Sequence, residues 1–553
     1  MTDHTTDDGT DATDDRRDAT DDETDATTTE TTRSNDVEPD TTEDVDPDTE
    51  IGERVLRGLA DHVTPLETTD PTAPRDDLDA FPESVLDAQI VGLGEATHGT
   101  REFFQFKDRL IRHLVADRGV RLVCLEANAP ETLALNRYVV HGEGDPAAGL
   151  AGVYFWTWQV EAVRDLLEWL RSFNEGRPVA DRVRFHGLDV QYTAGAVDRL
   201  ERLLETVAPE TCEELADDLA TLHDDGERVD EADHSDAREA ALARVRDRLG
   251  GAADTDSCLS DPDGDWAAAT SDPDAMAATD LHLCLETLGG AVEYKRRVAD
   301  WRAARESVDS TDDADDGRAD ESDDDRAAES NHESAEAAAM AALLGTRDEV
   351  MADLVDTMLD RTGAERAVIW GHDAHVNRDR SGLRDRDLSG TSLGSELADR
   401  YGQDYRAVGF AWGHGAFQAI GPSALAPDGS ESGTTVSGSQ DDGSDDGAGE
   451  SEDGPSLDHD LAVWETDGPP ANSLDAALAA AGHDVSVLDV RGAAGDERVR
   501  DWLDTPQRHR SVGATYDPRE PETYVVTYPY PDAFDAVVFV DETTAARPLD
   551  GRD

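Results

Sequence analysis

The sequence predicts an α/β protein whose mostly parallel sheet is flanked by helices, with helical additions and disordered acidic insertions. Two observations predict this class. Short apolar runs rich in β-branched and aromatic residues, which are typical of buried strands, recur along the chain. Stretches with the apolar spacing of helices lie between them, as expected when crossover helices join parallel strands.

The predicted elements follow in chain order. The first four apolar runs begin at Ile90, Arg121, Val183 and Ala367, and later strands are predicted over 407–412, 485–490 and 536–540. Residues 102–116 and 160–173 each place large apolar side chains on one helical face. Alanine and leucine at helical spacing predict a longer helix over 335–362.

The composition indicates the environment in which the protein works. The chain of 553 residues carries a net charge of −78 and only two lysines, Lys107 and Lys295. Carboxylates at this density repel one another unless molar salt shortens the Debye length to about 3 Å. We therefore predict a halophilic protein with an acidic surface. Such a surface disfavours nucleic acid and anionic membranes as partners.

Neither a membrane segment nor a disulfide framework is predicted. No apolar run is long enough to cross a bilayer. The first 50 residues lack an apolar segment, so Arg16-Arg17 is not expected to act as an export signal. The four cysteines show no C-x-x-C spacing, and Cys124 lies within a predicted strand. We therefore expect a cytoplasmic protein.

Three acidic stretches divide the chain. Residues 1–48 predict a disordered tail, because they have too few apolar side chains to offset the entropy of ordering. Residues 306–334 and 425–458 have a similar composition. Because strand-like runs resume after each of them, we interpret them as disordered insertions in one catalytic domain over 49–545. Residues 205–275 predict a polar, poorly defined helical segment.

Charged or imidazole side chains follow four of the predicted strands. They are Glu95 with His98, Glu126, Asp189, and His372 with His375. Because ligands bind at the carboxyl ends of parallel strands, we expect these side chains to lie at one edge of the sheet. Histidine titrates near neutral pH and a carboxylate can orient it, so the set predicts acid–base chemistry.

Lys107 and Arg347 are candidate cations for this site. Lys107 lies about one turn inside the helix that follows His98, and its retention in a chain almost without lysine favours a function. A surface ion pair is the alternative. Taken alone, an arginine such as Arg347 in an Arg-rich chain is more often solvated than part of a site. Trp156 and Trp158 could form an apolar wall for a ligand, although core packing explains at least one of these rings equally well.

Several ordered motifs resemble the erythromycin esterase family. They are Gly94-Glu95-Ala96-Thr97-His98-Gly99, Glu102-Phe103-Phe104-Gln105-Phe106-Lys107, Leu125-Glu126-Ala127, Trp156-Thr157-Trp158-Gln159, Leu166-Leu167-Glu168-Trp169-Leu170-Arg171, Gly187-Leu188-Asp189, Thr346-Arg347-Asp348, Trp370-Gly371-His372-Asp373-Ala374-His375, Gly394-Ser395-Glu396-Leu397 and Val408-Gly409-Phe410. Together they extend from about residue 50 to 545, apart from the acidic stretches.

The resemblance implies metal-independent, cofactor-free hydrolysis of a small-molecule ester or lactone. Family members that open macrolides confer antibiotic resistance. Carried over by motif, His98 is the general base that activates water and Glu95 orients it. The resemblance assigns Glu126, His372 and His375 to the water-binding cluster and Arg347 to the active-site arginine. Lys107 stands where the motif of the resistance enzymes has arginine; it keeps the charge but loses the bidentate fork.

Three alternatives stay open. Ser392 lies in a G-x-S-x-G pattern, but the preceding Arg384-Asp385-Arg386-Asp387 is no apolar strand, as a nucleophile elbow requires. The same Glu and His set could ligate zinc or manganese, although no H-E-x-x-H pair is present. A binding homologue or an enzyme with a different substrate is the third alternative. The sequence does not indicate the oligomeric state.

Overall fold

The computed structural model describes residues 51–224, 236–253, 273–312, 345–379, 391–422 and 459–549. The strands are β1 (Val63–Pro65), β2 (Ile90–Leu93), β3 (Leu122–Asn128), β4 (Arg184–Asp189), β5 (Ala367–Trp370), β6 (Tyr405–Pro422), β7 (His459–Thr466), β8 (Val485–Asp489), β9 (Gln507–Arg510), β10 (Val525–Tyr528) and β11 (Ala536–Thr543). The predicted tail at 1–48 and insertion at 425–458 lie outside the described residues.

The helices are α1 (Glu53–Ala60), α2 (Glu83–Leu86), α3 (Arg101–Asp117), α4 (Leu133–His141), α5 (Pro146–Ala151), α6 (Glu161–Asn174), α7 (Ala194–Val207), α8 (Pro209–Leu222), α9 (Asp236–Ala253), α12 (Pro273–Asp312), α14 (Asp373–Val376), α15 (Leu393–Tyr401), α16 (Leu474–Ala479), α17 (Val490–Ala494), α18 (Arg500–Leu503) and α19 (Tyr530–Ala533). Residues 345–362 are also helical. None of the helices described is long and apolar enough to cross a membrane.

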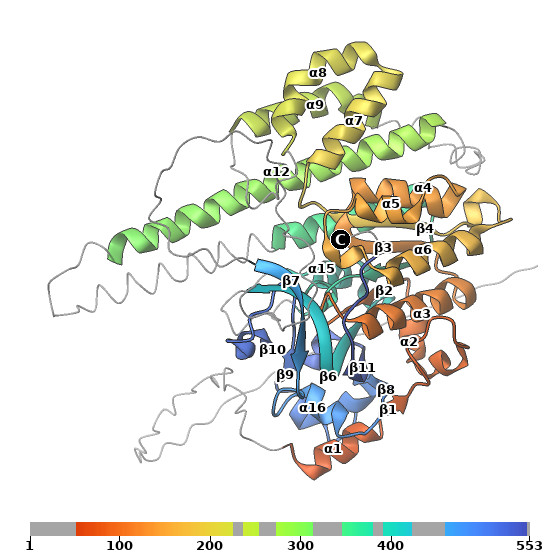
Figure 1. The fold of residues 1–553 in the computed structure, drawn as a ribbon, viewed down its shortest axis with the longest axis vertical. Helices are drawn as coiled ribbons and strands as arrows, with labels where there is room; N and C mark the ends of the chain where they lie inside the picture. Colours follow the sequence, from red (N-terminus) through yellow and green to blue (C-terminus); the bar gives the residue numbers. More distant parts are fainter. Residues whose placement is uncertain are drawn as a thin grey trace, which may run out of the picture. The chain divides into compact units, whose positions relative to one another are not determined.

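Strands β9 and β10 form a small two-stranded sheet, and a nine-stranded sheet organises the rest of the described residues (Figure 1). Its strand order is β1-β8-β11-β6-β2-β5-β3-β4, with β7 paired to β6. The strands from β11 to β4 run parallel, whereas β1, β7 and β8 pair antiparallel with their neighbours. The predicted mixed α/β class with a mostly parallel sheet is therefore confirmed.

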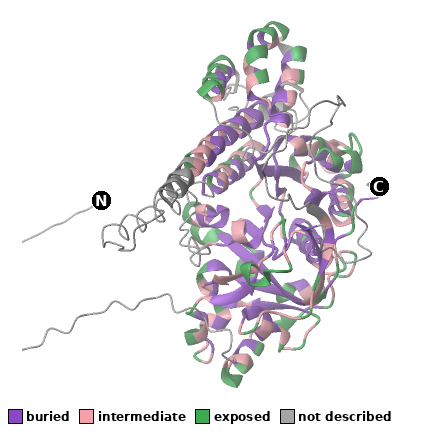
Figure 2. Ribbon diagram, turned by 60° about the vertical axis from the view of Figure 1, so that its left-hand side comes forward, coloured by how far each residue is buried: buried purple, intermediate pink, exposed green. Residues whose placement is uncertain are grey.

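Both faces of the sheet are buried, which explains why its strands read as continuous apolar runs. Val91 and Val123 contribute to a core with α3 and α6 on one face. Their strand neighbours Ile90 and Leu122 contribute to a second core with the helix over 345–362. Figure 2 shows these strands as a buried layer between helices. The predicted helices at 102–116 and 160–173 correspond to α3 and α6.

The helical additions form a separate core of their own. In Figure 1, α7, α8 and α9 gather beside the long helix α12, and their apolar side chains pack together. Residues 306–312, predicted as the start of a disordered insertion, instead continue α12 to Asp312. The alanine and arginine residues over 302–305, together with Glu306, are strong helix formers and favour this continuation. Residues 313–334 lie outside the described part of the chain.

Candidate active site

The carboxyl ends of four adjacent strands carry most of the predicted site residues. β2 and β3 both pair with β5, residue for residue up to Trp370. Glu95, just after β2, and Glu126, near the end of β3, therefore stand on either side of His372, which follows β5. Asp189 ends β4 at the next position along the sheet. This is the edge at which parallel sheets bind ligands.

Glu126 lies at an irregularity of β3. The pairing of β3 with β4 shifts by one residue between Leu125 and Asn128, and such a bulge re-aims the side chains around it. Glu126 Oε2 accepts the backbone N–H of His372 at 2.9 Å. Glu126 Oε1 accepts from Arg347 Nη2 at 2.7 Å. The bulged strand thereby directs one carboxylate to two other predicted site residues.

Glu95 and His98 form a carboxylate–imidazole pair in the turn between β2 and α3. His98 Nδ1 lies 2.7 Å from Glu95 Oε1. The Glu95 side chain is fully buried, whereas that of His98 is 14% exposed. A carboxylate that accepts from Nδ1 keeps the proton on that nitrogen and leaves Nε2 as the basic one. The pair is therefore arranged to take a proton at Nε2.

Lys107 lies behind this pair, with no solvent exposure. Its ammonium donates to Glu95 Oε2, the oxygen that also accepts Trp370 Nε1–H at 2.9 Å. The ammonium lies 4.5 Å from the centre of the Trp370 ring, a favourable cation–π distance. Burial lowers the pKa of Lys107 to about 8, although Glu95 opposes this shift. Lys107 thus holds Glu95 from the interior side.

A second charged group surrounds Arg347. The guanidinium binds Asp189 through Nε at 2.9 Å and Nη2 at 2.8 Å, in addition to Glu126. His375 joins the group, with Nε2 3.1 Å from Glu126 Oε1 and Nδ1 2.6 Å from Asp348 Oδ1. Arg347 and His375 are 15% and 18% exposed, but none of the three carboxylates exceeds 7%. The cations therefore lie toward solvent and the carboxylates behind them.

The charges in this group set one another's protonation. Burial alone would lower the pKa of His375, but Asp348 and Glu126 outweigh it and raise that pKa to about 10. Burial alone would likewise raise the pKa of Glu126, but His375 and Arg347 hold it well below its usual range. Arg347 Nη1 also lies 2.9 Å from His375 Nε2, so the raised pKa of His375 reflects two carboxylates that outweigh both burial and this neighbouring cation.

His372 links the two groups. Its ring centre lies 4.9 Å from that of His98. Nδ1 accepts the N–H of Ala374 at 3.1 Å, and Nε2 lies 3.3 Å from the carbonyl oxygen of Val512. Burial and the neighbouring His98 hold the pKa of His372 well below its ordinary value. His372 is thus a neutral ring whose two nitrogens are both engaged.

The sequence also fits a family model. The model described as erythromycin esterase matches residues 115–543, which is most of the chain. The chain belongs to the erythromycin esterase family. The resemblance predicted from the sequence motifs is thereby confirmed.

Curated relatives match over shorter segments. Erythromycin esterase type II of Escherichia coli is 26% identical over 139 residues, which are 25% of this chain and 32% of that protein. The Bacillus subtilis protein YbfO, whose name describes a hydrolase, is 26% identical over 174 residues, or 31% of this chain and 37% of its own. The chain thus matches about a third of the length of these relatives.

Solved structures share the fold over nearly all of the chain. A succinoglycan biosynthesis protein is 15% identical with a TM-score of 0.61, covering 90% of this chain and 99% of its own. A Bacillus cereus protein is 18% identical with a TM-score of 0.62, covering 90% and 98%. An erythromycin esterase mutant in its open conformation is 18% identical with a TM-score of 0.51, covering 88% and 98%. These likenesses support the α/β fold.

The residues predicted to bind substrate lie deep in this family member. Trp158 is 1% exposed; its Nε1 donates to the carbonyl of Glu126 at 3.1 Å, and its ring stacks on Phe104. Asp189 is fully buried behind Arg347. Trp156, in the same short 3-10 helix as Trp158, is 7% exposed. Trp158 and Asp189 are therefore placed to support other site residues.

Three further contacts at the site were not predicted from the sequence. Asp348 binds His375, Trp370 donates to Glu95, and the Val512 carbonyl faces His372. Asp348 and Trp370 both stand inside motifs of the erythromycin esterase family, next to residues that were singled out. Val512 contributes through its backbone, so its side-chain identity carries no signal.

Ser392 is the N-cap of α15 rather than part of a nucleophile elbow. Its hydroxyl accepts from Ser395 N at 3.1 Å and donates to the Asn377 carbonyl at 2.8 Å, while its backbone N–H donates to Ser395 Oγ at 2.9 Å and completes a capping box. Helix α15 follows Ser392 directly, and residues 380–390 before it lie outside the described part of the chain. The hydroxyl is engaged by backbone groups and has no histidine partner among its described contacts.

Replacing Ser392 with alanine should therefore cost stability and leave any esterase activity unchanged. Loss of an N-cap costs about 0.5–2 kcal/mol of folding free energy. Urea unfolding in molar KCl measures that loss, and turnover of the best ester measures activity at a temperature where both forms are folded. A Ser392→Ala protein that folds but is inactive would make Ser392 a nucleophile after all.

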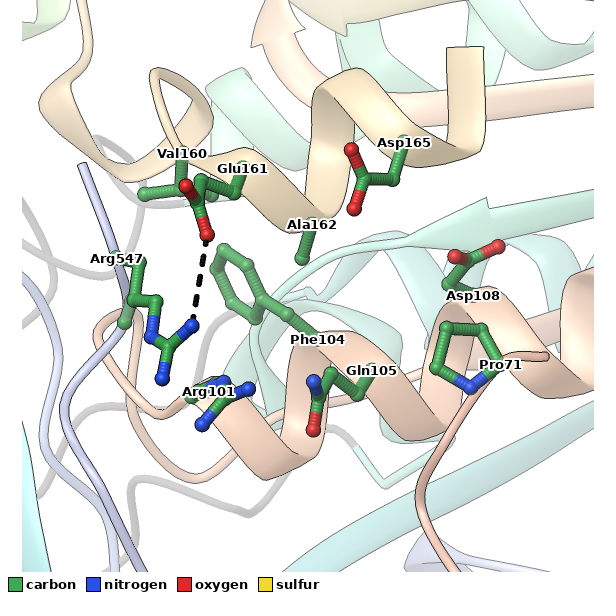
Figure 3. A pocket seen from close by; sticks show the side chains of 11 residues that line it. Pro71, Arg101, Phe104, Gln105, Asp108, Val160, Glu161, Ala162, Asp165 and Arg547 are labelled. Carbon is green, nitrogen blue, oxygen red and sulfur yellow. Dashed lines mark ion pairs between the residues drawn. The ribbon is translucent and has the colours of Figure 1, made fainter. Parts of the chain in front are cut away.

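A separate cavity of about 170 Å³ lies between α3 and α6. Figure 3 shows Arg101 and Arg547 at one end and Asp108 and Asp165 at the other. Its lining includes none of the predicted site residues. Asp108 is already bound by Arg112, which lies outside the lining, through two contacts of 2.7 and 2.6 Å. This cavity therefore lies apart from the candidate active site.

Proposed function

We propose that this protein hydrolyses a carboxylic ester or lactone with water activated by His98. The observation that carries the proposal is the Glu95–His98 pair, in which a fully buried carboxylate lies 2.7 Å from Nδ1 of a partly exposed histidine. This arrangement leaves Nε2 free to act as a general base toward solvent. Membership of the erythromycin esterase family supports the same chemistry.

The reaction needs one proton acceptor and one site for negative charge. His98 Nε2 takes a proton from water while the water oxygen adds to the carbonyl carbon. The tetrahedral oxyanion that results is stabilised by nearby cations. As the ester C–O bond breaks, His98 returns the proton to the leaving alkoxide. The products are a carboxylic acid and an alcohol, which remain joined as a hydroxy acid if the substrate is a lactone.

Arg347 and His375 are the cations best placed to meet the oxyanion. Both are charged and partly exposed, while their carboxylate partners lie behind them. A donor of this kind typically contributes 10²–10³-fold to the rate, or about 3–4 kcal/mol. Glu126 orients both cations and, through the backbone N–H of His372, the adjoining turn.

Lys107, Asp189 and Trp158 act behind the reacting groups. The ammonium of Lys107 is enclosed by Glu95 and aromatic rings, so it fixes Glu95 rather than the oxyanion. Asp189 holds Arg347, and Trp158 holds the backbone of Glu126. We assign all three as positioning residues, and Trp156 remains the ring proposed to border a ligand.

A metal-dependent hydrolase is the alternative use of the same residues. Its donors would include Glu95 and Glu126, but in this structure all four of their carboxylate oxygens already accept from protein groups. Among the residues that the structure describes, no three His, Cys, Asp or Glu side chains converge as metal ligands. The occupied oxygens support the metal-free proposal, which a chelator can test.

The test is hydrolysis of aryl esters and lactones, including macrolides, by the full-length protein in molar KCl. We expect turnover that a chelator leaves unchanged and that His98→Gln lowers about 10²–10⁴-fold in kcat. His483→Gln, between α16 and β8 and away from the site, is the matched control. Turnover abolished by chelator and restored by one metal would support the metal-dependent alternative. Absence of turnover on every ester would contradict the proposed reaction.

A further inference from the structure

A third group of buried charges lies directly behind the turn that carries His372 and His375. Asp373, the first residue of α14, has its Oδ2 3.4 Å from Nε2 of His509 in β9. The other ring nitrogen of His509 lies 3.3 Å from Oδ2 of Asp475 in α16. None of these three side chains is more than 2% exposed. The reaction proposed above uses none of them.

The two carboxylates favour the charged form of the His509 imidazole. Burial alone would lower the pKa of His509, but Asp475 and Asp373 outweigh it and raise that pKa to about 9. The rings of Tyr528 and Tyr530 border the imidazole, with centres 5.8 and 6.2 Å away. Separating the partners in such an enclosure would leave an uncompensated buried charge, which is strongly unfavourable.

Asp373 ties the His372–His375 turn to strand β6 and to the loop that follows β2. Its backbone N–H donates to the Glu95 carbonyl at 3.0 Å. Its carboxylate oxygens each lie 3.3 Å from the backbone nitrogen of Phe410 in β6. A side chain at position 94 would collide with this carboxylate, so Gly94 makes room for it. The carboxylate that His509 binds is therefore an anchor of the turn.

The chain that leaves β9 holds the same turn at a second point. Three residues after His509, the Val512 carbonyl lies 3.3 Å from His372 Nε2. The backbone N–H of Val512 donates to the Ala96 carbonyl at 2.7 Å, beside His98. Residues 509–512 therefore contact both the His372 turn and the Glu95–His98 loop. Any shift of His509 would be passed to the two groups that face each other across the site.

We propose that His509 is a positioning residue for the hydrolytic site, which binds Asp373 and thereby fixes the His372–His375 turn against His98. The proposal rests on the proposed function. His509 touches no substrate, so its loss should lower kcat and leave KM nearly unchanged. Small misplacements of reacting groups can cost on the order of 10²-fold in rate. We therefore expect kcat to fall about 10- to 100-fold in His509→Gln.

A double-mutant cycle tests whether His509 acts through Asp373. If it does, His509→Gln combined with Asp373→Asn should lose little more kcat than either single change, because the two residues act as a unit. Losses that multiply would overturn the proposal. His186→Gln, which replaces a buried histidine in β4 of the nine-stranded sheet, is the matched control. It should lower stability without this kcat effect. If His509→Gln and His186→Gln lose kcat equally, the role of His509 is merely structural and the proposal is overturned.

Crystal structures of wild type and His509→Gln give a readout that does not depend on turnover. We expect the variant to lose the contact between His372 Nε2 and the Val512 carbonyl, and its His372 ring to move away from His98. A variant in which both remain in place would overturn the positioning role. If the wild type hydrolyses no ester, the proposed reaction fails, while these structures still decide whether His509 positions the turn.

Discussion

Replacing Arg347 with methionine should remove both activity and much of the stability of the site. Three carboxylates, Glu126, Asp189 and Asp348, would then share one remaining cation, His375, in a largely buried position. Breaking a buried ion pair by removing one partner costs about 3–5 kcal/mol. Loss of an oxyanion cation lowers kcat by a further 10²–10³-fold. Urea unfolding and ester turnover, both in molar KCl, measure the two effects.

Two companion variants separate the stability effect from the catalytic one. Adding Asp189→Asn to Arg347→Met removes one uncompensated buried charge, so it should restore part of the stability and none of the turnover. Arg347→Lys keeps the charge but cannot bind Asp189 and Glu126 with a planar fork, so it should lie between wild type and Arg347→Met. If the Arg347→Met protein is as stable and as active as wild type, Arg347 has no role in the site and is an ordinary solvated arginine.

Arg347 also illustrates what the sequence could and could not predict. An arginine in an Arg-rich acidic chain carries no signal by itself, and only the family motif singled it out. Its position became meaningful once the helix over 345–362 was seen to place it against the ends of β3 and β4. By contrast, Glu95 and His98 were predictable from local pattern, because an apolar strand followed by ionisable residues is typical of a sheet-edge site.

The strands of the parallel core were predictable from their apolar local sequences, but the polar strand β9 was not. β9 (Gln507–Arg510) consists of polar and charged residues and pairs with β10. Nothing in its local sequence marks it as a buried strand. His509 is buried because Asp373 and Asp475, from distant parts of the chain, satisfy its charge. The third charged group therefore depends on tertiary contacts that residue spacing does not encode.

Stability should fall as pH rises above about 7, because two buried histidines, His375 and His509, bind protons more tightly in the folded state. The pKa of His375 is raised from 6.5 to about 10 and that of His509 to about 9. Each contribution is fully present below the unfolded pKa of 6.5 and is lost as pH rises through the folded value. By pH 8 these two histidines hold nearly two extra protons in the folded state, which contributes a slope approaching about −2.7 kcal/mol per pH unit. The lowered pKa values of His372 and His186 act with the opposite sign near pH 6.5, because the unfolded state binds those protons more tightly, so the net fall develops above about pH 7.

Lys107 opposes this fall in stability at higher pH, because folding lowers its pKa instead of raising it. Burial lowers its pKa from 10.5 to about 8, so between these values the unfolded state binds more protons and its contribution rises with pH. The slope should therefore become shallower above pH 8. Urea unfolding at fixed ionic strength in molar KCl measures the curve, and His509→Gln should remove about half of the slope between pH 7 and 8. A slope between pH 7 and 8 that is the same in wild type and in His509→Gln would mean that His509 is neutral in the folded protein at these pH values.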